Sequence, residues 1–190
     1  MNPVRNSSAL VLILGLVASL GATAAPIIAI QPGAQAVPVG GTLTADVVAT
    51  NLSNEFIGAF DLTIDWDPLL LAFDSLSFDT FLDGPALSIQ GFTPGAGSLN
   101  VFEVSYSALA GQTGNDPFRL FSVSFLSLGE GVSRVDFSST VSQILSDGSG
   151  EEFGNAGFTG GTVTATPATT VPEPGRLSTR ISPRFLRTSE

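Results

Sequence analysis

Apolar and polar side chains alternate along much of this chain, and the alternation limits the fold more than any other feature of the sequence. Between residues 42 and 50 the apolar positions Leu43, Ala45, Val47 and Ala49 alternate with Thr42, Thr44, Asp46 and Thr50. A period of two places successive side chains on opposite faces of a strand, whereas a helix repeats every 3.6 residues. This segment is therefore predicted to be a strand with one apolar and one polar face.

The same alternation is stronger over residues 56–66. One face carries Phe56, Phe60, Leu62, Ile64 and Trp66, and the other carries Asp61, Thr63 and Asp65. Helical spacing would place the two aspartates on the apolar stripe, so a helix is rejected. We expect Trp66 to lie in the core and Asp61, Thr63 and Asp65 to be exposed.

Turns and further strands follow this segment. Asp67-Pro68 predicts a turn, and the apolar parity slips between Phe73 and Leu76, which indicates a β-bulge in the next strand. More strands are predicted at 87–92, 99–106, 118–126, 133–138 and 161–166, with a helical turn near 79–82. The pattern predicts an all-β fold, an antiparallel β-sandwich of about nine strands.

The N-terminus has the features of a secretory leader. Arg5 precedes an apolar run over residues 9–20, and small residues at 22–24 fit a cleavage site, so residues 1–25 are predicted to be a signal peptide. The run is shorter than the ~20 residues of a membrane span. Exported proteins can form disulfides, but this chain contains no cysteine, so an apolar core must hold the fold together.

The charge distribution excludes two classes of partner. Only Arg119 and Arg134 are basic between residues 26 and 170, and all seventeen carboxylates except Glu173 and Glu190 lie there, leaving fifteen. The domain therefore carries a net charge near −13. Nucleic acid and anionic lipid are excluded, because both are bound through cationic side chains.

Little catalytic chemistry is available, because histidine, lysine and cysteine are absent. Asp65 and Asp67 flank Trp66 and would share one face of a strand, as the two carboxylates of a glycosidase do. The favoured alternative is that Asp65 lies on the polar face and Asp67 begins an Asp-Pro turn. Asp147, Glu151 and Glu152 offer oxygen ligands for calcium in a Gly-rich loop, although the spacing also fits a plain turn. Tyr106 is the one aromatic candidate for stacking on a sugar, since Trp66 is assigned to the core.

Residues 26–166 resemble a cohesin-like domain. The resemblance rests on FIGAFDLTIDWDPLLLAFDSLSF at 56–78, supported by PVGGTLTADVVATNLS at 38–53, PFRLFSVSF at 117–125, and the closing segments SDGSG and GGTVT. It implies a nine-stranded jelly roll that binds a partner and does not catalyse. In cellulosomal members the partner is a dockerin, which itself carries the calcium, so no cofactor is expected in this domain.

The C-terminus resembles a PEP-CTERM sorting signal, with its box at Val171, Pro172, Glu173 and Pro174. The resemblance implies a surface or matrix protein of an exopolysaccharide-producing Gram-negative bacterium. An apolar helix normally follows the box, but residues 176–190 read RLSTRISPRFLRTSE, which cannot span a membrane. We expect a linker at 167–175 and a disordered basic tail at 176–190, with a reading-frame slip as one hypothesis for its origin.

These features predict an exported, non-enzymatic interaction or matrix module. A protein partner would bind one sheet face or edge, with Asp61, Thr63, Asp65 and Tyr106 as the candidate contacts. The alternative is a carbohydrate-binding module of the exopolysaccharide matrix, in which Tyr106 would contact the sugar.

Overall fold

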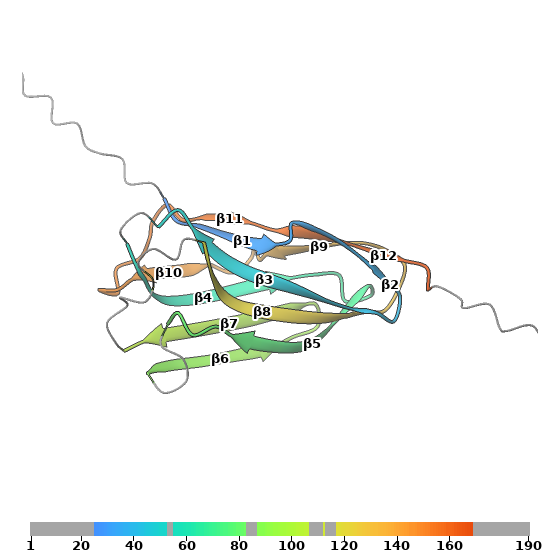
Figure 1. Ribbon diagram of the computed structural model, residues 1–190, viewed down its shortest axis with the longest axis horizontal. Coiled ribbons are helices and arrows are strands. Elements are labelled where there is room, and N and C mark those ends of the chain that lie inside the picture. The colour runs from blue at the N-terminus through green and yellow to red at the C-terminus, as the bar shows by residue number, and fades with distance from the viewer. Residues whose placement is uncertain (1–24, 53–54, 83–86, 107–111, 113–116, 169–190) are drawn as a thin grey trace, which may run out of the picture.

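The computed structural model describes residues 25–52, 55–82, 87–106, 112 and 117–168 (Figure 1). Twelve β-strands in two sheets make up most of this part of the chain. No helix long and apolar enough to cross a bilayer occurs among these residues. The predicted leader, the sorting box and the basic tail lie outside them, apart from residue 25 and the first linker residues.

The first sheet has five strands in the order β11-β1-β3-β8-β5. Their bounds are Gly157–Thr159 for β11, Ile27–Gln31 for β1, Thr42–Thr50 for β3, Phe118–Ser127 for β8 and Leu71–Phe78 for β5. The predicted bulge in β5 is confirmed, because its register with β8 shifts between Phe73 and Ser75. The longest strands, β3 and β8, form the centre of this sheet.

The second sheet has seven strands, six of them in the order β2-β12-β9-β4-β7-β6. The bounds are Ala34–Pro38 for β2, Gly161–Thr166 for β12, Gly131–Phe137 for β9, Ile57–Asp65 for β4, Ser98–Ser105 for β7 and Ser88–Pro94 for β6. The seventh strand, β10 (Ile144–Asp147), pairs with β4 beside the end of β9. Thus β4 lies in the middle of the sheet, and β6 lies at one edge (Figure 1).

The predicted all-β sandwich is confirmed, with three differences in detail. The sheets are mixed, because β1 pairs with β11 and β2 pairs with β12 in parallel. Four short strands, β1, β2, β10 and β11, were not predicted, since three to five residues are too few for a clear period. The expected helical turn at 79–82 is a bend and turn, in which the Thr80 N–H donates to Asp79 Oδ1 at 2.7 Å.

The core lies between the sheets and is built around aromatic side chains. Phe60 of β4 stacks on Phe121 of β8 with ring centroids 5.7 Å apart, so this pair joins the two layers. Trp66 is only 7% exposed, as predicted, and its indole Nε1 donates to the Leu71 carbonyl at 2.8 Å. Phe56, in contrast, precedes β4 and is half-buried, and Ile57 takes the interior position instead.

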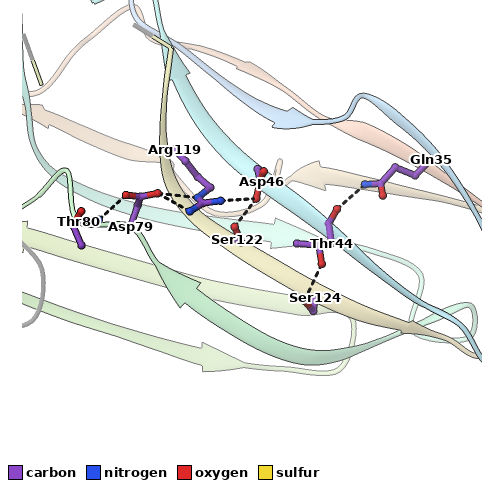
Figure 2. A network of polar contacts seen from close by, with 8 residues as sticks. All are labelled: Gln35, Thr44, Asp46, Asp79, Thr80, Arg119, Ser122 and Ser124. Atoms are coloured by element: carbon purple, nitrogen blue, oxygen red, sulfur yellow. Dashed lines mark hydrogen bonds and ion pairs between the residues drawn. The ribbon is translucent and has the colours of Figure 1, made fainter. Parts of the chain in front are cut away.

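Polar contacts cover the outer face of the five-stranded sheet (Figure 2). Arg119 Nη2 lies 2.8 Å from Asp79 Oδ2 and its Nη1 lies 3.7 Å from Asp46 Oδ1. The Ser122 hydroxyl also donates to Asp46, and Thr44 and Ser124 share a hydrogen bond nearby. The polar side chains on this face therefore satisfy one another.

Candidate functional site

The predicted contact residues of β4 lie on the outer face of the seven-stranded sheet. Asp61 and Thr63 face Phe102 and Asn100 of β7 in the antiparallel register. Asn100 Nδ2 donates to Asp61 Oδ1 at 2.6 Å and to Thr63 Oγ1 at 3.3 Å. We call Asp61, Thr63 and Asn100 the polar row. Its three side chains are held in one orientation by these hydrogen bonds.

The expectation that this strip is fully exposed is wrong. Thr63 is only 8% exposed, and Asp61 and Asp65 are half-buried. The segment between β9 and β10 also contacts this part of β4. In this segment the Gln143 side chain accepts from the Thr63 N–H, and the Ser138 N–H donates to the Thr63 carbonyl, both at 2.8 Å.

Beside the polar row lies an apolar patch formed by Leu87, Ile89, Val104 and Tyr106. Ile89 of β6 faces Val104 of β7 in the register, and the Tyr106 N–H donates to the Leu87 carbonyl at 2.9 Å. Ile89 is 54% and Tyr106 is 68% exposed, so the candidate contact Tyr106 lies at the surface. Exposed apolar side chains gathered on one face mark interaction surfaces more often than single ones do.

Part of this surface was not found by sequence reasoning. Residues 87–92 were predicted as a strand. The prediction did not say which face of β6 meets the core, and this decides whether Leu87 and Ile89 are exposed. Asn100 was also missed, since its position opposite Thr63 follows from the register of β4 with β7. The alternation of Leu99 and Val101 with Asn100 was the available signal.

Glu103 of β7 is turned in the opposite direction, toward the interior. It is fully buried, on the same side of the strand as Leu99 and Val101, and it accepts a hydrogen bond from the Ser88 hydroxyl at 2.8 Å. The single carboxylate of β7 therefore does not face the solvent. As a result, the outer surface of β6 and β7 carries no charged side chain.

The two carboxylates considered for glycoside chemistry have different environments. Asp67 Oδ1 accepts from the Leu69 N–H at 2.9 Å, and the Asp67 carbonyl accepts from Leu70 and Leu71, so Asp67 begins the predicted turn. Asp65 and Asp67 also line a shallow hollow of about 470 Å³, which includes the ion pair between Arg134 and Asp136. The Asp67 carboxylate, which accepts a hydrogen bond from a backbone N–H, therefore stabilises the turn.

The loop at 147–152 is organised by Asp147. Its Oδ1 accepts from the Ser149 hydroxyl at 2.7 Å and from the Ser149 and Glu151 N–H groups at 2.8 and 2.9 Å. Asp147, Glu151 and Glu152 line one hollow, yet no three acidic side chains within the described ranges are placed to hold a metal ion. The geometry corresponds to the predicted turn.

The hydrogen bonds of Asp147 give a test by pH. The Ser149 hydroxyl, followed by the backbone N–H groups, lowers the pKa of Asp147 below its ordinary value of 3.8. The ionised carboxylate therefore stabilises the fold above that value, and this stabilisation is lost as the pH falls through the lower folded pKa. We expect Asp147→Asn to melt below the parent near neutral pH, with the difference in Tm disappearing in acid. Glu152→Gln is the charge control; a difference independent of pH would contradict the assignment.

Comparison with known proteins identifies the architecture. No family model matches the sequence, and no curated protein matches it. Among solved structures, the sixth cohesin of scaffoldin B from Acetivibrio cellulolyticus, solved in complex with a dockerin mutant, aligns with a TM-score of 0.63 and 16% identity. The alignment covers 75% of this chain and 99% of the cohesin. The fold is cohesin-like.

Two further structures have the same cohesin-like fold. A non-cellulosomal cohesin from Archaeoglobus fulgidus aligns at a TM-score of 0.58 with 16% identity, over 75% of this chain and 92% of that one. The seventh type I cohesin of a Pseudobacteroides cellulosolvens scaffoldin aligns at 0.60 with 17% identity, over 80% and 97%. At such identities the shared property is the fold, and surface residues are not carried over.

Proposed function

We propose that this domain is an exported, non-enzymatic module that binds a protein through the outer face of β4, β7 and β6. The observation that carries the proposal is the juxtaposition of the apolar patch with the polar row. Apolar side chains contribute buried area in such a contact, and an adjacent hydrogen-bonded row fixes the orientation of the partner. The fixed Asn100 would lose little conformational freedom on binding.

The chemistry and the fold support binding over catalysis. The sequence has no histidine, lysine or cysteine, and Asp67, one of its two candidate catalytic carboxylates, begins a turn. A cohesin of similar fold was solved in complex with a dockerin, which supports a protein as the class of partner. The identity of the partner is left open, because exposed residues decide it and these differ between proteins of one fold.

The location outside the cell is also part of the proposal. It rests on the leader at 1–25 and the Val-Pro-Glu-Pro box at 171–174. A domain that carries a net charge near −13 and no cysteine suits a secreted matrix, since like-charged copies repel and stay soluble. We place the protein at the surface or in the extracellular matrix of a Gram-negative bacterium.

A capture experiment tests the binding face. The full chain, immobilised and exposed to the secretome of its host, is expected to retain a protein that Tyr106→Ser no longer retains, because the variant removes the most exposed apolar side chain of the patch. Leu128→Ser, which also changes an exposed apolar residue but outside this face, is the matched control. Equal capture by the two variants would refute the proposed face.

A polysaccharide remains the second candidate ligand, because Tyr106 is largely exposed and tyrosine rings stack on sugars. A glycan array read with the parent and with Tyr106→Ser separates the two functions. Retention of sugars by the parent and its loss in the variant would favour the carbohydrate-binding module over the protein-binding one.

A further inference from the structure

The start of strand β1 borders an acidic hollow. Pro26, directly before β1, is buried and forms part of the wall of a hollow of about 530 Å³. The same wall contains the carboxylates of Glu55, Asp147, Glu151 and Glu152. The turn after β10 and the start of β1, which pairs with β11 (Figure 1), therefore border one space.

Hydrogen bonds hold the main chain at this point. The Gly157 N–H of β11 donates to the Pro26 carbonyl at 2.8 Å, and Asn51 Nδ2, just after β3, donates to the Ala25 carbonyl at 2.7 Å. Consecutive Cα atoms are ~3.8 Å apart, so the nitrogen of Ala25 lies within one residue of the wall of the hollow. The pairing of β1 with β3 and β11 sets this position, and the carboxylates do not contribute to it.

The described part of the chain offers no cationic side chain to the four carboxylates of the hollow. Arg119 and Arg134 are the only basic residues between 26 and 170. Arg119 pairs with Asp46 and Asp79, Arg134 pairs with Asp136, and neither arginine lines the hollow. Like charges that share a site repel one another, so a cation placed there would stabilise the fold.

Cleavage of the predicted leader produces a cation at this position. The Ala22-x-Ala24 pattern places the cut after Ala24, and Ala25, which is bonded to Asn51, then stays with the domain as its first residue. A peptidase breaks the Ala24–Ala25 peptide bond by hydrolysis. The oxygen of water bonds to the Ala24 carbonyl carbon, giving a carboxylate, and the two protons of water pass to the Ala25 nitrogen, giving an ammonium group. Before cleavage the same nitrogen is an uncharged amide.

We propose that the α-ammonium group of Ala25, formed when the leader is removed, binds to the carboxylates of this hollow, so that processing stabilises the domain. The inference rests on the proposed export but requires no partner on the binding face. Asp147 already accepts three hydrogen bonds through Oδ1 and holds the turn, so Glu55, Glu151 and Glu152 are the main acceptors. The precursor lacks this ion pair and is expected to be less stable than the processed chain.

Acetylation tests the contact, because the sequence has no lysine and the α-amino group is therefore the single primary amine of the processed chain. The chain 25–190 is released from a fusion by a protease that leaves Ala25 as its first residue, and part of the sample is acetylated. Acetylation removes the positive charge and is expected to lower Tm by about 3 °C, the size of change for a partly exposed ion pair in a domain of this length. An unchanged Tm would overturn the proposal.

Two triple variants locate the acceptors. The hollow variant removes three carboxylates that line the hollow and is Glu55→Gln/Glu151→Gln/Glu152→Gln. The control variant removes three carboxylates that do not line it and is Asp65→Asn/Asp74→Asn/Glu130→Gln. Acetylation should change the Tm of the hollow variant by about 1 °C or less and should lower that of the control as much as that of the parent. Equal changes in the two triple variants would overturn the proposal.

Amide hydrogen exchange on the parent chain gives a local measurement that requires no variant. The Glu151 N–H donates to Asp147 Oδ1 at 2.9 Å beside the hollow, and the Leu69 N–H donates to Asp67 Oδ1 at 2.9 Å in a turn that does not line it. Acetylation should speed exchange at Glu151 and leave it unchanged at Leu69. Equal changes at the two amides would contradict binding in the hollow.

Two outcomes concern other occupants and the export itself. If acetylation lowers Tm only after residues 176–190 are removed, the basic tail and not the terminus fills the hollow, and the proposal is overturned. N-terminal sequencing of the protein recovered from the medium of its host is expected to begin at Ala25. A chain that keeps residues 1–24 would overturn both the processing step and the proposed export. Failure of the acetylation tests on an exported chain would overturn the inference alone.

Discussion

Replacing Phe121 with alanine is expected to lower the free energy of unfolding by about 4 kcal/mol, the range found for large-to-small changes in cores. Phe121 is fully buried on β8, stacks on Phe60 of the opposite sheet at 5.7 Å and contacts Phe78 of β5 at 6.5 Å. Its loss removes apolar burial and leaves a cavity between the layers. Urea denaturation measures the effect, with the buried Trp66 as the single tryptophan reporter.

Two variants make this result interpretable. Leu128→Ala removes an exposed apolar side chain, 47% accessible, and should change stability by less than about 0.5 kcal/mol. Phe121→Leu keeps much of the volume and should fall between the two. Since domains are stable by only ~5–15 kcal/mol, the alanine variant should approach unfolding at moderate temperature. A loss below ~1 kcal/mol for Phe121→Ala would contradict the packing of the two sheets at this position.

Alternation predicted the central strands because, along each of them, every second side chain faces the core and the others face solvent. The strand at 42–50 and the interior position of Trp66 follow from period two alone, and the bulge near Phe73 follows from the slip in parity. The resemblance to cohesin-like domains gave the jelly-roll architecture that the solved structures support. A long strand with one solvent-exposed and one buried face contains enough residues to show which of its side chains face the core.

Short strands and pairing partners are set by tertiary contacts and could not be read in this way. β10 has four residues, Ile-Leu-Ser-Asp, and pairs with the part of β4 that β9 does not reach. Thr63 was expected to be exposed because its own strand gives it the polar face. In the fold Thr63 is buried, and its N–H donates to Gln143, eighty residues away, a contact that no local pattern contains.

The candidate site shows the same division between local and long-range information. Tyr106 was found because a lone tyrosine is conspicuous in a sequence with fourteen phenylalanines. Asn100 and the apolar patch required the register of β4, β7 and β6, which fixes which side chains share a face. The calcium candidate at 147–152 depended on composition, whereas the hydrogen bonds of Asp147 form the turn that was the alternative prediction.

Gln112 makes a distinctive long-range contact: its side chain forms the two hydrogen bonds to β4 that a neighbouring strand would otherwise form. Its Oε1 accepts from the Ile57 N–H at 2.8 Å, and its Nε2 donates to the Ile57 carbonyl at 2.7 Å. Both residues are buried, Gln112 being 4% exposed. One side chain thus satisfies both main-chain groups at the first residue of β4, which lies beyond the last paired residue of β7.

Gln112→Met is therefore expected to lower the free energy of unfolding by about 3 kcal/mol. Methionine has a similar length and keeps the apolar volume, but it leaves a buried N–H and a buried C=O without partners, each costing ~1–3 kcal/mol. The start of β4 should also open locally, since its ladder is no longer closed there. Urea denaturation measures the loss of stability, and amide hydrogen exchange at Ile57 measures the local opening.

The matched control is Gln35→Met, because Gln35 also donates its side-chain amide to a main-chain carbonyl, that of Thr44 at 2.9 Å, but at an exposed site. Water replaces the lost partner there, so this variant should change stability by less than about 0.5 kcal/mol. Comparing the two variants separates the free-energy cost of burying an unpaired main-chain group from the cost of losing a glutamine side chain. Equal losses in the two variants would mean that water reaches Ile57 as easily as Thr44, and that Gln112 does not close the edge of β4.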